Sequence, residues 1–174
     1  MSDNFRCELT FPRDALNRDS ICDALKYDLN LSEEEVDELR NGEALDLEQI
    51  GPDYDQPGLI CACDVHARLG EMETTERALF EAGFAFNASA EGYMEFEPEV
   101  RYWRPGMAAP ATLKRTEGGD AYTLTPALRE AIARTASMSD PGEIRAEFER
   151  LAEESDPAIV PIKSYASAIT ENAA

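Results

Sequence analysis

Basic residues are scarce in this chain of 174 residues. Sixteen Lys and Arg stand against 36 Asp and Glu, so the formal net charge is -20 and the isoelectric point lies near 4.3. A protein that binds nucleic acid directly needs a basic surface that displaces counterions from phosphate. An anionic membrane surface repels so acidic a protein for the same electrostatic reason. The composition therefore excludes direct binding to either partner.

Residues that hold metals or act as nucleophiles are also few. The chain has one histidine, His66, and its cysteines lie at positions 7, 22, 61 and 63. Structural zinc needs two pairs of closely spaced ligands, and Cys61 and Cys63 form the only such pair. On a strand these two side chains point to one face and His66 to the other, so the three cannot meet at one ion. No nucleophile elbow, phosphate-binding glycine loop or EF-hand spacing is present. We therefore expect no metal, no cofactor and no enzymatic activity.

Long apolar segments are missing as well. No stretch approaches the roughly 18 apolar residues that a membrane-spanning helix needs, and the first residues lack the pattern of a signal peptide. The scattered cysteines do not form a disulfide framework, which is typical of proteins in a reducing compartment. We expect a cytoplasmic protein without membrane contact.

The apolar residues that are present alternate along several segments and recur with helical spacing along others. Alternation predicts strands over Phe5–Phe11, Leu59–Leu69, Tyr93–Phe96, Val100–Trp103, Ala111–Arg115 and Ala121–Thr125. Helical spacing and capping residues predict helices over Ser20–Leu29, with Ser20 as N-cap, over Thr75–Ala82, and twice after Thr125. In the second strand we place Leu59, Cys61, Cys63, Val65, Ala67 and Leu69 on the core face. The pattern predicts an α+β fold, an antiparallel twisted sheet flanked by helices in one domain over residues 1–156. Residues 157–174 are expected to form a partly mobile tail.

The segment from Leu31 to Ile50 has two interpretations. Ser32 followed by Glu35 is a capping box, which favours a helix. Asn41-Gly42 is a strong hairpin signal, which favours strands over Val36–Arg40 and Glu43–Ile50. The sequence leaves both open.

Three segments together resemble the class I type III secretion chaperones of Gram-negative bacteria, a family of small acidic chaperones for secreted effectors. Ile21–Leu31 is similar to the first helix of that family and its following leucine turn. Gly58–Gly70 looks like the third strand, which ends in a Leu-Gly step, and Thr75–Asn87 looks like the second helix. Tyr93–Pro98 resembles the strand that follows. The similarity is one of hydrophobic pattern and covers less than half of the chain.

The resemblance implies a homodimeric α+β module without catalytic activity, which binds the extended N-terminal segment of a secreted effector and keeps it soluble and competent for secretion. It also implies a hairpin over Val36–Ile50. The expected partner-binding groove is formed by Ile21, Leu25, Leu29, Leu47 and Ile50. The expected dimer interface is formed by Ala78, Leu79 and Ala82.

The net charge also fits a second class of protein, an acidic DNA mimic that occupies the basic groove of a DNA-binding or defence nuclease complex. Residues 1–58 hold more than half of the charge excess, 16 acidic against five basic residues. A mimic needs one continuous acidic face, whereas a chaperone needs apolar surface bordered by acidic residues. The distribution of charge on the folded protein therefore discriminates between the two.

Overall fold

The computed structural model describes residues 4–43, 45, 50–52, 58–68, 70–92, 97–116, 125–157, 159 and 162. One antiparallel sheet has the strand order β2-β3-β1-β4-β5-β6. Its strands are β1 (Asn4–Pro12), β2 (Ile50–Pro52), β3 (Leu59–Arg68), β4 (Phe86–Ala90), β5 (Glu99–Trp103) and β6 (Ala111–Lys114). The helices are η1 (Arg13–Asn17, 3-10), α1 (Asp19–Leu29), α2 (Glu33–Asn41), α3 (Glu73–Ala82), α4 (Thr125–Thr135) and α5 (Pro141–Ser155). The predicted α+β class and antiparallel sheet are confirmed.

The N-terminal strand β1 lies in the middle of the sheet. Leu9 is opposite Ala62 of β3 on one side and opposite Ala88 of β4 on the other. Cys7, Leu9 and Phe11 alternate along β1 and are fully buried. Because alternate residues of a strand share a face, these three side chains form the floor of the hydrophobic core.

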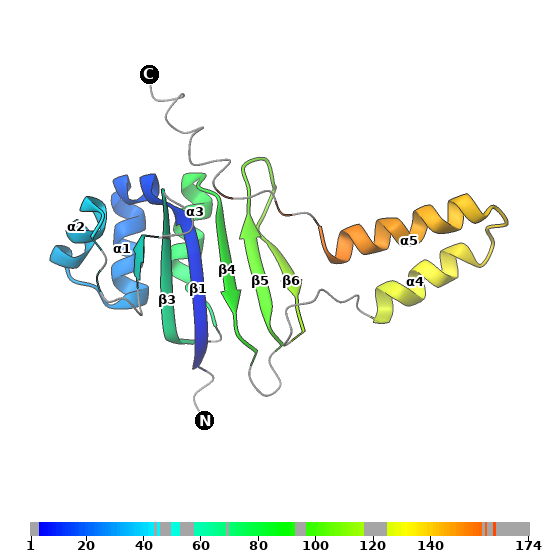
Figure 1. The fold of residues 1–174 in the computed structure, drawn as a ribbon, viewed down its shortest axis with the longest axis horizontal. Coiled ribbons are helices and arrows are strands. Elements are labelled where there is room, and N and C mark those ends of the chain that lie inside the picture. The colour runs from blue at the N-terminus through cyan, green and yellow to red at the C-terminus, as the bar shows by residue number, and fades with distance from the viewer. Residues whose placement is uncertain are drawn as a thin grey trace, which may run out of the picture.

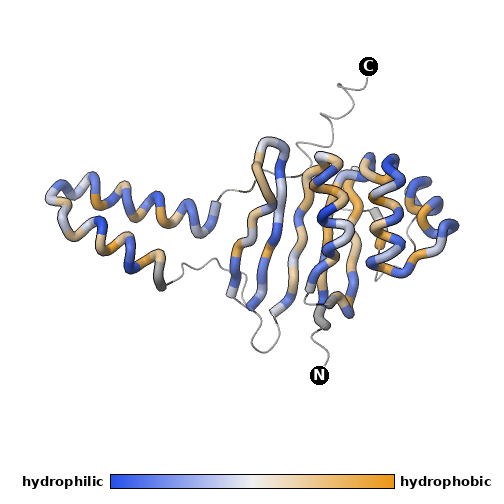
Figure 2. The backbone as a smooth tube through the Cα atoms, turned by 180° about the vertical axis from the view of Figure 1, so that it is seen from behind, coloured by the Kyte–Doolittle hydropathy of each residue, from blue (hydrophilic) through white to orange (hydrophobic). Residues whose placement is uncertain are grey.

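Helices α1 and α3 pack side by side. In Figure 1, α3 lies behind the strands and α1 lies beside it, to the left of β3, and Figure 2 shows α3 in front of the strands. A carboxylate joins the two helices: Asp28 at the end of α1 accepts hydrogen bonds from the backbone N and the Oγ1 of Thr75, both at 2.8 Å. These bonds satisfy a free N–H group in the first turn of α3, whose own N-cap makes no side-chain bond. Within the described residues, no helix lies on the opposite face of the sheet.

The predicted orientation of β3 is wrong over its first half. Ile60 and Ala62 lie opposite Phe11 and Leu9, so they face the helices, and Cys61 and Cys63 therefore face the other way. The pairing register shifts between Phe5 and Cys7 of the neighbouring strand. A bulge of this kind changes which face each later residue occupies. Past it, Ala67 lies in the core, as predicted, whereas Val65 is exposed.

Residues 33–41 form helix α2, so the capping box prevails over the hairpin signal. The Oγ of Ser32 accepts from the Glu35 backbone N, and the Glu35 carboxylate accepts from the Ser32 backbone N at 2.7 Å. Gly42 adopts a left-handed conformation with φ of 89° and ends the helix, which explains the Asn41-Gly42 pair without a hairpin. The hairpin that the family resemblance implied is therefore wrong over its first strand.

Other predicted boundaries differ by a few residues. Helix α1 begins at Asp19 after Arg18, so Ser20 lies inside the first turn and is not its N-cap. Helix α3 begins at Glu73, two residues before the predicted start at Thr75, and ends before Gly83, as the sequence predicts. The predicted strands Tyr93–Phe96 and Ala121–Thr125 lie outside the described residues, except Thr125, which begins α4. Most of the predicted tail is likewise outside them, although Ile162 is described and is buried against Leu59 and Ala85.

The last two helices form a hairpin that projects from the β6 side of the sheet (Figure 1). We call α4 and α5 with their connection the arm. Asp140 caps α5 by accepting from the backbone N of Gly142 at 3.1 Å, and Pro141 stands at the first helical position. An ion pair of 2.9 Å between Arg115 and Asp156 joins the end of α5 to the chain just past β6. The two predicted final helices are confirmed.

The capping box gives a test of this fold. Replacing Ser32 by Ala removes the side-chain acceptor at the start of α2, and we expect the free energy of unfolding to fall by about 1 kcal/mol. Ser20→Ala is the matched control, because Ser20 caps nothing and Ala is the better helix former. Urea unfolding followed by circular dichroism measures both. Equal losses from the two substitutions would contradict the assigned helix starts.

Candidate partner-binding surface

The structure places most of the predicted groove residues in the hydrophobic core. Ile21 and Leu25 of α1 are fully buried, and Ile50 of β2 is 3% exposed. Leu29 is partly buried against the same core, and Leu47 lies outside the described residues. A partner could reach Ile21 and Leu25 only if α1 left the sheet, and Ile50 is buried in the same core. Their role in partner binding stays a prediction, and they form no open groove in this structure.

The three residues of the predicted dimer interface do not share one exposed face. Leu79 points from α3 into the core and is fully buried, and Ala78 packs partly against the same core. Ala82 is exposed at the end of the helix. Of the three, Ala82 presents the most surface to a second molecule.

Helices α1 and α3 leave the other face of the sheet uncovered, and we call it the open face. Strand pairing places opposite residues on the same face, so Thr10, Asn87 and Tyr102 belong to it with Cys61 and Cys63. These side chains are small or uncharged, and all but Cys63 are partly accessible. The sequence did not indicate this face, because the apolar alternation along β3 placed Cys61 and Cys63 in the core.

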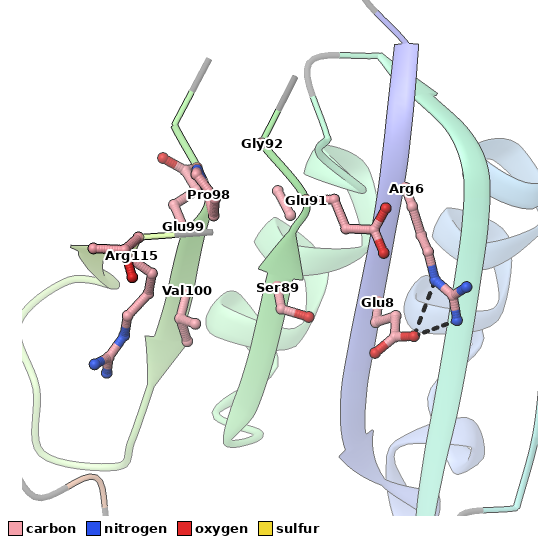
Figure 3. A pocket seen from close by; sticks show the side chains of 11 residues that line it. Arg6, Glu8, Ser89, Glu91, Gly92, Pro98, Glu99, Val100 and Arg115 are labelled. Atoms are coloured by element: carbon pink, nitrogen blue, oxygen red, sulfur yellow. Dashed lines mark hydrogen bonds and ion pairs between the residues drawn. The ribbon is translucent and has the colours of Figure 1, made fainter. Parts of the chain in front are cut away.

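A pocket of about 480 Å³ lies at one end of the open face (Figure 3). Ser89 of β4 and Val100 of β5 are opposite each other in the sheet and form its floor. Arg6 and Glu8 of β1, which are ion-paired at 2.5 Å, stand on one side, and Arg115 stands on the other. The remaining described lining residues are Ala90, Glu91, Gly92, Pro98, Glu99 and Thr116.

Gly92 and Pro98, at the two ends of the connection between β4 and β5, approach each other closely and form one wall of this pocket (Figure 3). A Cβ atom on Gly92 would lie 2.4 Å from the Cδ of Pro98, so only glycine fits here. Among the described lining residues, none is a cysteine or a histidine. The wall and floor combine apolar groups with charges of both signs, an arrangement suited to holding a peptide side chain or main chain.

The helix-side face of β5 carries a buried ionic cluster. Arg101 is bound by both oxygens of Glu76 of α3, at 2.9 and 2.7 Å, and donates to the Gly70 carbonyl at 2.8 Å. Glu99 accepts from Arg101 and from Lys114 of β6, each at 2.5 Å. These charge-assisted bonds fix α3, β5 and β6 relative to one another, because Arg101 joins β5 to α3 and Lys114 joins β6 to β5.

The cluster also shifts the titration of its carboxyl groups. Burial raises the pKa of Glu99, but hydrogen bonds from Lys114 and Arg101 outweigh it, so the pKa lies below its usual range. Burial raises the pKa of the nearby Glu71 carboxyl. A lowered folded-state pKa contributes stability above the unfolded pKa of about 4.3, and this stability is lost as pH falls through the folded value.

We therefore expect Glu99→Gln to lower the free energy of unfolding by about 2 kcal/mol at pH 7. The difference from the wild type should shrink as the pH falls below the unfolded pKa of about 4.3, and it should be lost only below the lowered folded-state pKa, where Glu99 is protonated in both states. Urea unfolding over a pH series measures it, with the exposed Glu153→Gln as control. A difference that stays constant with pH would show that the charge of Glu99 is not responsible.

The cysteines and the histidine show no arrangement for nucleophilic chemistry. Burial raises the pKa of Cys7 to about 12, and Cys22 donates to the Leu16 carbonyl at 3.2 Å. His66 is exposed, and its backbone N donates to the Asp64 carboxylate at 2.8 Å. No group of three or more potential metal-ligating side chains occurs in the part of the chain that the structure describes. In the same part, no helix combines the length and the apolar composition that crossing a bilayer requires.

Comparison of the chain with protein-family models, with curated proteins and with solved structures finds no match.

Proposed function

We propose that this protein is a cytoplasmic chaperone that binds the extended N-terminal segment of a secreted effector and keeps the effector soluble and competent for secretion. The observation that carries the proposal is the open face of the sheet with its pocket of about 480 Å³. The client would lie on this face, and not along α1 as the sequence predicts. The proposal needs no catalytic group and no cofactor.

An extended peptide suits this surface for two reasons. Small and uncharged side chains such as Thr10, Asn87 and Ser89 let a peptide main chain come close to the sheet. Strand β6 is an edge of the sheet, so its outward backbone groups can pair with an added strand. The large net negative charge keeps such a complex soluble, because like charges suppress self-association.

The alternative, a DNA mimic, requires acidic side chains that are not neutralised by cations. On the surface of α1 and α2, however, two basic residues pair with acidic side chains. Lys26 bridges Asp23 and Glu33 at 2.8 and 2.5 Å. Arg40 contacts Asp19 at 2.9 Å and Asp37 at 3.4 Å in the same way. These pairs interrupt the acidic stripe, which favours the chaperone over the mimic.

The test compares the wild-type protein with variants that carry a substitution on the open face. The tagged wild type and Val100→Glu are used to capture proteins from nuclease-treated native lysate, and the recovered N-terminal segment is then synthesised for titration. We expect Val100→Glu to weaken binding of that segment at least tenfold, about 1.4 kcal/mol, because it places a charge on the floor of the pocket. Circular dichroism verifies that the variant is folded, and Ser89→Glu on the facing strand provides a second perturbation.

Tyr27→Glu is the matched control, because it adds the same charge at a residue of α1 that is 79% exposed. Its affinity should equal that of the wild type. A loss with Tyr27→Glu and none with Val100→Glu would move the client to α1. Recovery of a DNA-binding or DNA-cleaving protein that duplex DNA displaces would replace the chaperone by the mimic.

A further inference from the structure

The arm carries most of the exposed apolar side chains of the described protein. Five large hydrophobic residues are exposed in the described part of the chain, and three of them, Leu128, Ile132 and Phe148, belong to α4 and α5. Of the described side chains of α4 and α5, only Ala131 and Leu151 are buried. A hairpin with so small a core gains little from its own packing, because helical stability in proteins comes mainly from burial of an apolar face.

One side of the arm is covered by ion pairs. Arg134 of α4 bonds to Glu147 of α5 at 2.6 Å, and Glu147 also accepts from Arg150 at 2.8 Å. Arg150 pairs further with Glu154, and Arg134 contacts Glu130. The hydrogen bonds from Arg150 and Arg134 lower the pKa of Glu147 to about 2, so this ionic network remains charged over the physiological range.

The exposed apolar residues lie on the other side. At 100° per residue, Leu128 and Ile132 fall on the opposite flank of Ala131 from Glu130 and Arg134. On α5, Phe148 likewise falls on the opposite flank of Leu151 from Arg150 and Glu154. Leu128 is rotated from Ala131 by the same angle and in the same sense as Phe148 is from Leu151. Because the two helices run antiparallel, these equal rotations place both side chains on the same side of the hairpin. The arm therefore has one ionic face and one apolar face.

The charges of the two helices are complementary to each other. Helix α4 has two arginines and one glutamate, a net charge of +1, in a chain whose total is -20. Helix α5 has five glutamates and two arginines, a net charge of -3. A client segment of one charge sign would match only one of these helices. A second arm offers both signs, so that α4 of one copy can lie against α5 of the other.

We propose that two copies of this chain pair through the apolar faces of their arms to form a four-helix bundle. Two antiparallel hairpins with amphipathic helices are the components of such a bundle. A two-fold axis makes the contact self-complementary, so each copy supplies and receives the same residues. The arm projects from the β6 side of the sheet, away from α1 and α3 (Figure 2), which leaves its apolar face clear of the helices that cover the core. The contact is distinct from the α3 interface that the sequence predicts and is independent of the client site.

Sedimentation equilibrium of the purified chain, without any client, tests the pairing. We expect the wild type to have twice the 19.3 kDa mass of one chain and Ile132→Glu to be a monomer at the same concentrations. Ile132 is 53% exposed, so the substitution should leave the monomer folded, which circular dichroism verifies. Ala133→Glu is the matched control, because it adds the same charge to the exposed outer side of the same helix and should leave the dimer intact.

A second variant reports on contact directly. Ile132→Cys places a thiol on the apolar face, whereas the native cysteines are buried or half-buried. Oxidation should link two copies through it, and the same treatment of Ala133→Cys should not. A monomeric wild type would overturn the proposal. A dimer that survives Ile132→Glu would also overturn it and would place the interface elsewhere, as at Ala82.

Discussion

The central position of β1 is the constraint on which the rest of the structure depends. This strand begins the described chain, yet it separates β3 from β4 and pairs with both. Its Cys7, Leu9 and Phe11 side chains all point to the same layer of helices. The sheet is therefore complete only when β3 and β4 both pair with β1, one on either side. The covered face is fixed at the same time, because alternation along β1 decides which side the core occupies.

Burial on one face leaves the other available for function. Helices α1 and α3 pack against the apolar residues of β1, β3 and β4. The hydrogen bonds between Asp28 and Thr75 hold the two helices together. Strands β5 and β6 extend past these helices and are fixed by the ionic cluster around Arg101. The open face and its pocket are thus presented on a rigid sheet. The arm is attached at the far side, and its apolar face is separate from the sheet.

The sequence predicts this architecture where the signal is local. Gly83 at the end of α3 follows from the local pattern. The Ser32–Glu35 capping box is also visible in the sequence, but the Asn41-Gly42 hairpin signal beside it left helix and hairpin both open. The orientation of β3 could not be read from its own alternation, because the register shift beside Cys7 of β1 decides it. The candidate site could not be predicted from the sequence either. The apolar spacing along α1 is the same whether its apolar side chains line a groove or face the core. Only the tertiary packing shows that Leu25 is buried.

The central claim is that an extended client segment lies on the open face of the sheet and pairs with the β6 edge. Hydrogen exchange measured by mass spectrometry, with and without the segment recovered from the native lysate, tests it most directly. The account predicts slower amide exchange in β5 and β6 when the segment is bound, because an added strand would pair with the β6 edge, and unchanged exchange in α1. Protection confined to α1 and α2, with β5 and β6 unaffected, would contradict it.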